Sequence, residues 1–265
     1  EKHSLIPLYR PFVPAKRYVK AKACMIETRA IGSVHAFLGI NRNTIKEPGI
    51  LRHCPHCRDE DRHLYGEEFW HRSHQIQGIL TCHKHGNWLQ EIHPFSGKPN
   101  SSGFISLGEQ PSLPPILPSD ERWQYHSQKL AIMAHWILKI SLSYLDPTEL
   151  YKRYHHHLRQ HDLIGLKGHF RQKKIAAQVI AHYPEDYLHR VGCSLNDNQS
   201  HSWLSDMLRN KRCVSSPLHH LLLLNALEID VEHFFSEAPQ VFLPFGSGPW
   251  PCLNRAANHY QENTI

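Results

Sequence analysis

Apolar residues recur at helical spacing over most of this chain of 265 residues, and the pattern predicts a mainly α-helical fold. The first helix is expected over residues 15–39, with Gly39 at its end and with apolar positions at Val19, Cys24, Met25, Ile31, Val34, Phe37 and Leu38. Further helices are expected over residues 123–145, 147–161, 171–183, 202–212 and 217–228. These short helices and tight connections predict a helical bundle with helix-turn-helix-like elements.

Two of the predicted helix boundaries carry recognisable signals. Ser119-Asp-Glu-Arg is expected to form the N-terminal cap of the helix over residues 123–145. Asp146-Pro147-Thr148 is expected to end that helix and to begin the next one, because a proline fits the first turn of a helix. Residues 94–118 change in composition to Pro, Ser and Gly, including Pro111-Ser-Leu-Pro-Pro, which predicts a linker.

Strand signals are weak except in residues 50–93, where cysteine and histidine follow another pattern. Cys54 and Cys57 form a C-x2-C pair, Cys82 and His85 form a C-x2-H pair, and twenty-four residues separate the two pairs. This spacing predicts a tetrahedral zinc site of four protein ligands, with no open position for a water molecule. The site is therefore interpreted as structural, held by two knuckle turns with short strands and a helix between them. Other histidines lie close enough to offer a different fourth ligand, namely His53, His56, His71 and His83.

Several other histidines and cysteines are candidates for metal binding or for a disulfide. His71 and His74 stand three residues apart, which could suggest a second metal, but hydrogen bonding at the surface or to a metal ligand is the favoured interpretation. The run His155–His157 is interpreted as a solvated turn, because adjacent helical side chains point in different directions. The cysteines outside the zinc pattern lack the spacing of a disulfide framework and suit a reducing compartment; they are Cys24, Cys193, Cys213 and Cys252.

The charge of the chain is unevenly distributed. Residues 1–93 carry fourteen Lys/Arg against nine Asp/Glu, residues 150–212 carry eleven against five, and residues 213–265 carry one against five. The excess of basic residues in these first two segments favours a polyanion as partner. An unevenly charged, solvated surface without such a partner would give the same distribution. The candidate DNA contacts gather at two predicted helices and are Lys167, Arg171, Lys173, Lys174, Arg209, Lys211 and Arg212. The alternative is a pair of ordinary amphipathic helices.

Signals for catalysis and for membrane insertion are missing from the sequence. The chain has no P-loop, GxSxG, HExxH or GxGxxG-helix motif, and no spacing picks out a pair of carboxylates, so we expect no enzyme. A zinc-dependent hydrolase is disfavoured because the quartet leaves no open position. No apolar run approaches the roughly 18 residues of a membrane span. Because the chain begins at Glu1 without an initiator Met, we expect it to be part of a longer protein.

The metal-binding segment as a whole resembles the TniQ/TnsD family of target-selection proteins from Tn7-like transposons. The matching residues include Cys54-Pro-His-Cys57, Asp61, Tyr65-Gly-Glu, Trp70-His-Arg, His74-Gln, Gly78, Cys82 and Lys84-His85-Gly86. The resemblance extends upstream to Pro7-Leu-Tyr-Arg-Pro-Phe, Gly32-Ser-Val-His35 and Leu38-Gly39. Downstream it takes in Arg171-Gln-Lys-Lys, Trp203-Leu, Arg209, Pro217-Leu-His-His-Leu-Leu-Leu and Phe245-Gly-Ser-Gly-Pro-Trp-Pro-Cys-Leu-Asn.

This resemblance implies an adaptor that engages double-stranded target DNA and recruits an AAA+ ATPase (TnsC-like), which brings in the transposase. Longer TnsD-like members bind a duplex attachment site directly, and shorter TniQ-like members ride on an RNA-guided CRISPR effector complex. The first is favoured here, because Pro-Trp-Pro-Cys252-Leu-Asn resembles the opening of a second zinc ribbon, although position 257 is Ala where a cysteine often follows. The resemblance also implies a bacterial cytoplasmic, nucleoid-associated protein whose N-terminal helix-turn-helix-like part would precede residue 1.

The chain is accordingly expected to divide into four parts. These are an N-terminal helix plus a zinc-finger module over residues 1–93, the linker over 94–118, a helix-turn-helix-like helical domain over 119–240, and the start of a possible second zinc ribbon over 241–265.

Overall fold

A computed structural model describes most of the chain. It covers residues 1–27, 31–40, 50–92, 106–108, 113–115, 118, 120–140, 142–165, 167–195, 202–209, 214–238 and 248–264, with the backbone alone for residues 31–33. Eleven α-helices, a 3₁₀ helix and one two-stranded sheet lie in this described part of the chain. The predicted mainly α-helical fold with a small β component is therefore confirmed.

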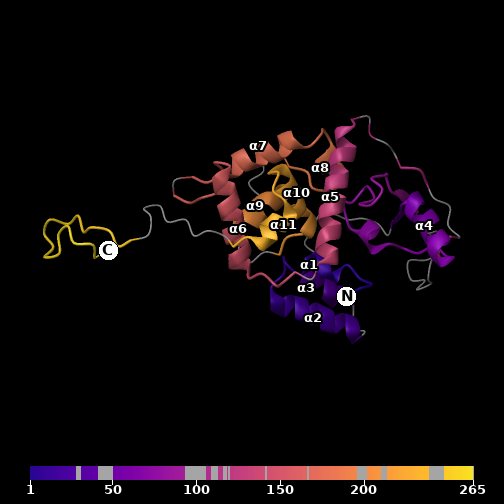
Figure 1. Cartoon of the computed structure of the whole chain (residues 1–265), viewed down its shortest axis with the longest axis horizontal. Helices are drawn as coiled ribbons and strands as arrows, with labels where there is room; N and C mark the ends of the chain where they lie inside the picture. The colour runs from indigo at the N-terminus through magenta and orange to yellow at the C-terminus, as the bar shows by residue number, and fades with distance from the viewer. Residues whose placement is uncertain are drawn as a thin grey trace.

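The N-terminal segment forms a helical hairpin. A single turn of helix, α1 (Ile6–Tyr9), precedes α2 (Ala15–Ile26) and α3 (Ile31–Leu38), which pack side by side (Figure 1). Arg17 Nη2 in α2 donates to the carbonyl oxygen of Ala36 in α3 at 2.6 Å. Nineteen residues of one straight helix would instead span about 28 Å. The prediction of one helix over residues 15–39 is therefore wrong, because the two halves bury their apolar faces against each other.

The metal-binding module, residues 50–92, is built on a two-stranded sheet. Strands β1 (Leu51–His53) and β2 (Gln90–Ile92) pair antiparallel, with Leu51 opposite Ile92. Between them lie α4 (Pro55–Tyr65) and the 3₁₀ helix η2 (Arg72–Gln75). Pro55 occupies the first turn of α4, and Gly66 ends the helix in the left-handed conformation, with φ +80°. The expected short strands with a helix between the knuckles are present.

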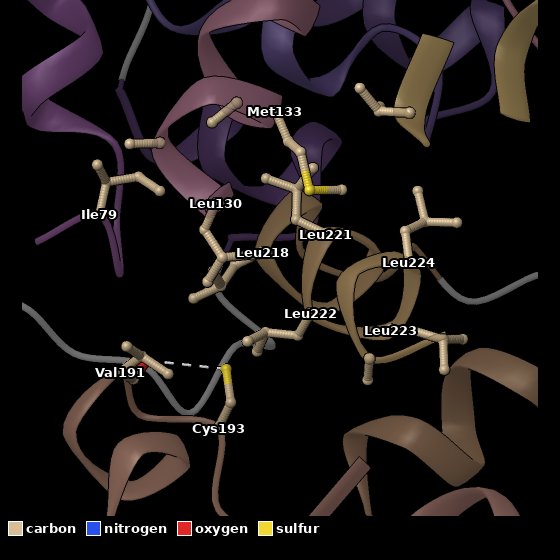
Figure 2. Packing of buried hydrophobic residues seen from close by; sticks show 14 of the residues in the cluster. Ile79, Leu130, Met133, Val191, Cys193, Leu218, Leu221, Leu222, Leu223 and Leu224 are labelled. Atoms are coloured by element: carbon tan, nitrogen blue, oxygen red, sulfur yellow. Dashed lines mark hydrogen bonds between the residues drawn. The ribbon is translucent and has the colours of Figure 1, made fainter. Parts of the chain in front are cut away.

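Two helices form the centre of the molecule. The long helix α5 (Arg122–Lys139) runs between the metal-binding module and the remaining helices (Figure 1), and it packs against α1, η2 and α10 (Pro217–Ala226). Every residue of α10 is buried, as expected of a helix that is apolar on all sides. Figure 2 shows its four consecutive leucines, Leu221–Leu224, packed with Leu130 and Met133 of α5. This pair of helices joins most of the elements into one core.

The other helices surround α10. They are α6 (Pro147–Gln160), α7 (Gln172–His182), α8 (Tyr187–Arg190), α9 (Trp203–Arg209) and α11 (Val231–Ser236). Asp146 begins α6 as predicted, because its carboxylate accepts from the backbone N–H of Thr148 at 2.8 Å. At the N-terminus of α5, Asp120 accepts from the backbone N–H of Arg122, whereas Ser119 lies outside the described residues. A turn closed by the bridge between Ile164 and Phe170 connects α6 to α7.

Helix α5 ends six residues before the predicted position. It stops at Lys139, and Ile140 is extended, with ψ 129°. The carbonyl oxygen of Leu138 instead accepts a bond from Arg72 Nη2 at 3.2 Å. Apolar spacing continues past this point because Leu142 packs against the core from an irregular segment. The prediction that α5 reaches Leu145 is therefore wrong.

Two separate hydrophobic clusters hold the described elements together. The larger unites the metal-binding module with α5, α6, α7, α9, α10 and α11, and includes Cys54, Cys57 and Cys82. The smaller consists of residues of the N-terminal hairpin and its neighbours, Ile6, Val13, Tyr18, Ala21, Leu38 and Val214. No helix within the described residues has the length and apolar character needed to cross a membrane.

Candidate metal centre

The four predicted ligands come from two short turns of the metal-binding module. Cys54 follows β1 as the N-cap residue of α4, and Cys57 lies in the first turn of that helix. Cys82 and His85 lie in a tight turn, in which the N–H of Gly86 donates to Cys82 O and the N–H of Cys82 donates to Asn87 O, both at 2.8 Å. Gly86 has φ +70°, a conformation that favours glycine. Each turn therefore presents two donors to a common point.

The donor atoms of these residues form a compact cluster. His85 Nδ1 lies 3.5 Å from Cys54 Sγ, 3.4 Å from Cys57 Sγ and 3.7 Å from Cys82 Sγ. The sulfurs of Cys57 and Cys82 are 3.6 Å apart. Zinc bonds of about 2.0–2.3 Å at tetrahedral angles place ligand atoms about 3.5–3.8 Å apart. Because the three cysteines are also buried, the arrangement fits one four-coordinate metal ion.

The protonation of the thiols also favours a cation at this position. Hydrogen bonding with Cys54 and Cys82, together with burial, raises the pKa of the Cys57 thiol well above its usual range. Three buried thiols cannot all ionise close together without a compensating positive charge. A divalent cation supplies that charge and binds the thiolate forms directly.

A carboxylate orients the histidine ligand. Glu60 Oε1 lies 3.1 Å from His85 Nε2, so the ring presents Nδ1 to the cysteines while Nε2–H donates to Glu60. Lys84 forms an ion pair with the other oxygen of the same carboxylate. Metal-binding histidines commonly have such a partner. The sequence analysis missed Glu60, although its place three residues after Cys57 on one helix could have indicated it.

The alternative histidines take other positions. His71 Nε2 bonds to Asp61 Oδ2 at 2.8 Å, and the ring of His56 lies 5.5 Å from the ring of His85. His53 is buried, and burial lowers its pKa to about 4. His83 stacks on His135 with ring centroids 3.6 Å apart. A second group, His74, Cys82 and His83, has donor atoms within 4.8 Å of one another and shares Cys82 with the first.

The candidate DNA contacts occupy two separate helices. Lys167 lies in the turn that precedes α7, and Lys173 and Lys174 lie in the first turn of α7. Arg171 and Lys174 each approach Asp162 Oδ2 at 3.2 Å. Arg209 is the last residue of α9, whereas Lys211 and Arg212 lie outside the described residues. Arg171, Lys173 and Lys174 therefore lie at one helix end, and Lys167 lies in the preceding turn.

The C-terminal segment contains the candidate second site. Cys252 is buried, its N–H donates to Glu262 O at 2.9 Å, and its carbonyl oxygen accepts from the N–H of Gln261 at 2.8 Å. Within the described ranges, Cys252 does not belong to a group of side chains able to hold a metal ion.

Comparison with known proteins places this chain among transposition proteins. The profile of the family described as "TnsD: Tn7-like transposition protein D" matches residues 130–265, and the TniQ profile matches residues 2–89. The chain is 28% identical over 229 residues to the transposon Tn7 transposition protein TnsD of Escherichia coli. That alignment covers 85% of this chain and 44% of the relative, so the chain spans less than half of the relative's length. The chain therefore belongs to the TnsD family of Tn7-like transposition proteins.

Proposed function

We propose that this chain selects the target site for transposition. In this role it binds specific double-stranded target DNA and recruits an AAA+ ATPase regulator, which brings in the transposase, and it performs no catalysis itself. The family assignment supports the role in transposition. The basic N-terminus of α7 is the observation that supports direct DNA binding, and the protein would act on the nucleoid in the bacterial cytoplasm.

The first turn of α7 is an unfavourable place for cations. The N-terminus of a helix carries a partial positive charge, which favours acidic residues there. Lys173 and Lys174 nevertheless occupy this turn, both exposed, and it contains no acidic residue. Asp162 already pairs with Arg171 and Lys174, so a phosphate group would replace this exposed carboxylate as their partner and would add a partner for Lys173. Arg171 is the N-cap residue of the same helix, and Lys167 in the preceding turn would extend the contact along the DNA backbone.

The DNA contact is tested by reversing these charges. We expect Lys173→Glu with Lys174→Glu to weaken binding to an attachment-site duplex by at least about tenfold and to reduce the salt slope by about two. The measurement is fluorescence anisotropy over a range of salt concentrations. The control is Lys129→Glu with Lys139→Glu, which makes the same charge change on exposed positions of α5. Equal affinities for all three proteins would remove α7 from the interface.

An adaptor for an RNA-guided complex is the second candidate, favoured by the match of residues 2–89 to the TniQ profile. In that case the chain would link a CRISPR effector complex to the transposition ATPase and touch DNA little. A mobility shift of the attachment-site duplex without any guide complex supports direct reading. A shift that appears only with the effector complex supports the adaptor.

We further propose that the cysteine-histidine cluster holds a structural zinc ion. Cys54, Cys57, Cys82 and His85 would fill its coordination sphere, and the zinc would supply folding energy. The support is the set of distances between donor atoms, together with the burial of the three cysteines.

Removing one ligand tests the zinc site. We expect Cys57→Ser to lose the ion and to destabilise the protein by several kcal/mol, because zinc binding to a structural site contributes on the order of 10 kcal/mol. Zinc content is measured by elemental analysis and stability by thermal melting. The control is Cys24→Ser, which changes a buried cysteine of α2 outside the cluster. A Cys57→Ser protein with full zinc content and native melting would contradict the proposal.

A further inference from the structure

His74 is a buried histidine beside the cluster that no ligand role explains. It lies in η2, is 1% exposed, and its Nε2 atom is 3.9 Å from Cys57 Sγ. The ring of His71, which Asp61 holds, packs against it with centroids 5.0 Å apart. His74 therefore points its polar edge at a sulfur from outside the four ligands.

The charge of the site calls for donors of this kind. Three thiolates and a neutral imidazole around Zn²⁺ leave one net negative charge in a buried position, and N–H donors lower the cost of burying it. The backbone N–H of Cys57 bonds to the sulfur of Cys54, and that of His85 bonds to the sulfur of Cys82. The sulfur of Cys57 lies 3.9 Å from His74 Nε2, and the His74 side chain is also within hydrogen-bonding reach of the sulfur of Cys82.

The neighbouring residue fixes His74 in this position. Gln75 Oε1 accepts from the backbone N–H of Arg52 at 3.0 Å, and Gln75 Nε2 donates to the Arg52 carbonyl at 2.6 Å. Arg52 belongs to β1, two residues before Cys54. These two hydrogen bonds tie η2 to the strand that leads into the first two ligands, and Gln75 Nε2 also donates to the carbonyl oxygen of His71 at 3.2 Å.

We propose that His74 is a positioning residue of the metal centre. Its Nε2–H donates to the Cys57 thiolate, which slows the release of the metal and makes that sulfur less reactive. Its role rests on the proposed zinc site. Residues that hydrogen-bond to a metal ligand in this way typically change metal affinity by about 10–100-fold.

A second metal ion held by His74, Cys82 and His83 is the competing use of this residue. Two observations favour the donor role. The rings of His74 and His83 are 6.5 Å apart, whereas His83 stacks closely on His135. Moreover, His74 Nε2 lies 3.9 Å from the sulfur of Cys57, which is outside that group.

The test compares single variants of the whole chain. His74→Phe keeps a ring but removes the donor, His74→Gln keeps an N–H donor, and His63→Phe makes the same change at an exposed position of α4. Zinc affinity is measured by chelator competition, and thiolate reactivity by the rate of zinc release during alkylation with N-ethylmaleimide. Cobalt substitution adds the sulfur-to-metal charge-transfer band, whose energy shifts when a hydrogen bond to the sulfur is removed.

We expect His74→Phe to lower zinc affinity by about 10–100-fold, to speed zinc release and to shift the cobalt band. His74→Gln should recover most of each effect, and His63→Phe should match the wild type. Unchanged affinity, release rate and band in His74→Phe would overturn the role of His74 while leaving the zinc site intact. Two zinc ions in the wild type, falling to one in His83→Ala, would also overturn it. Wild-type protein that binds no zinc would instead overturn the metal centre itself.

Discussion

Gly78 of the metal-binding module lies directly against Leu218 of the central helix α10. Its φ is +77°, and a Cβ atom built on it would lie 2.3 Å from Leu218 Cδ2. Leu218 is buried in the larger hydrophobic cluster, so its side chain has little room to move away. A side chain at position 78 therefore meets both an unfavourable backbone conformation and a steric clash.

We expect Gly78→Ala to lower the free energy of unfolding by about 3 kcal/mol, the sum of backbone strain and overpacking. Gly66→Ala is the matched variant, because Gly66 has φ +80° with open space around the added Cβ. It should lose only about 1 kcal/mol. Chemical denaturation of both proteins measures the difference, and equal losses would show that the contact with Leu218 costs nothing.

Local spacing made the candidate ligands predictable. Cys54 with Cys57 and Cys82 with His85 each lie within one turn, so chain geometry alone brings each pair together. The residues that hold these ligands in position were harder to predict from the sequence. Gln75 acts by pairing with Arg52, twenty-three residues away, and only the folded module sets that contact.

At the scale of elements, the helix boundaries follow specific hydrogen bonds. The side chain of Asp146 caps α6, and Arg72 donates a hydrogen bond to the Leu138 carbonyl oxygen at the end of α5. The Asp146 cap depends only on neighbouring residues, so it could be predicted from the sequence, and the structure confirms it. The second depends on a residue sixty-six positions away, which explains why the end of α5 was misplaced.

Removing the cap of α6 gives a test at this scale. We expect Asp146→Ala to destabilise the protein by about 1 kcal/mol, because the N–H of Thr148 loses its acceptor. Asp59→Ala changes an exposed aspartate of α4 that makes only a surface ion pair, so its cost should stay near 0.5 kcal/mol or less. Urea denaturation distinguishes the two, and the same midpoint for both variants would contradict a capping role.

The N-terminal hairpin shows why periodicity alone predicted one helix where the chain forms two. Both α2 and α3 bury apolar residues at helical spacing, so the pattern runs through residues 15–39 as in one helix. The hairpin is selected by tertiary contacts, since Tyr18 and Leu38 belong to the same small cluster. The short helices α1, α8 and α11 escaped prediction because four to six residues are too few to establish a period.

At the scale of the whole molecule, buried histidines make stability depend on pH. Burial or partial burial lowers the pKa of eight histidines, to about 3 for His220, to about 4 for His53, His83, His126, His157 and His219, and below the usual value for His135 and His182. Each stays neutral in the folded state, whereas the unfolded chain takes up protons below about pH 6.5. The unfolded state therefore binds more protons in this range, and stability falls as the pH falls from about 6.5 toward 3.

His220 offers the cleanest test because it is fully buried, stacked on Phe12 and hydrogen-bonded to Tyr154. We expect His220→Phe to be less stable than the wild type at pH 7.5, since the Tyr154 hydroxyl loses its partner. Between pH 6 and 5, however, the variant should lose less stability, by up to about 1.4 kcal/mol per pH unit. Denaturation curves at several pH values measure both slopes. Parallel slopes would mean that His220 does not titrate on unfolding.

One hydrophobic cluster extends across the proposed boundary between the first and third of the four parts. The larger cluster contains three cysteines of the metal-binding module as well as Leu221–Leu224 of α10. Loss of the proposed metal ion would therefore also weaken the packing of the helices that carry the candidate DNA contacts. We propose the boundary at residues 94–118 as a division of sequence and function, with the two sides sharing apolar contacts.

The separate cluster of the N-terminal hairpin has a consequence for motion. Six buried side chains hold α2 and α3 in place, and Val214 is the member contributed from the far part of the chain. Cooperative units of a protein open with free energies that follow their buried apolar contacts. The hairpin can therefore detach as a sub-global unit, exposing its backbone amides to solvent hydrogen exchange, while the metal-binding module and α10 stay closed.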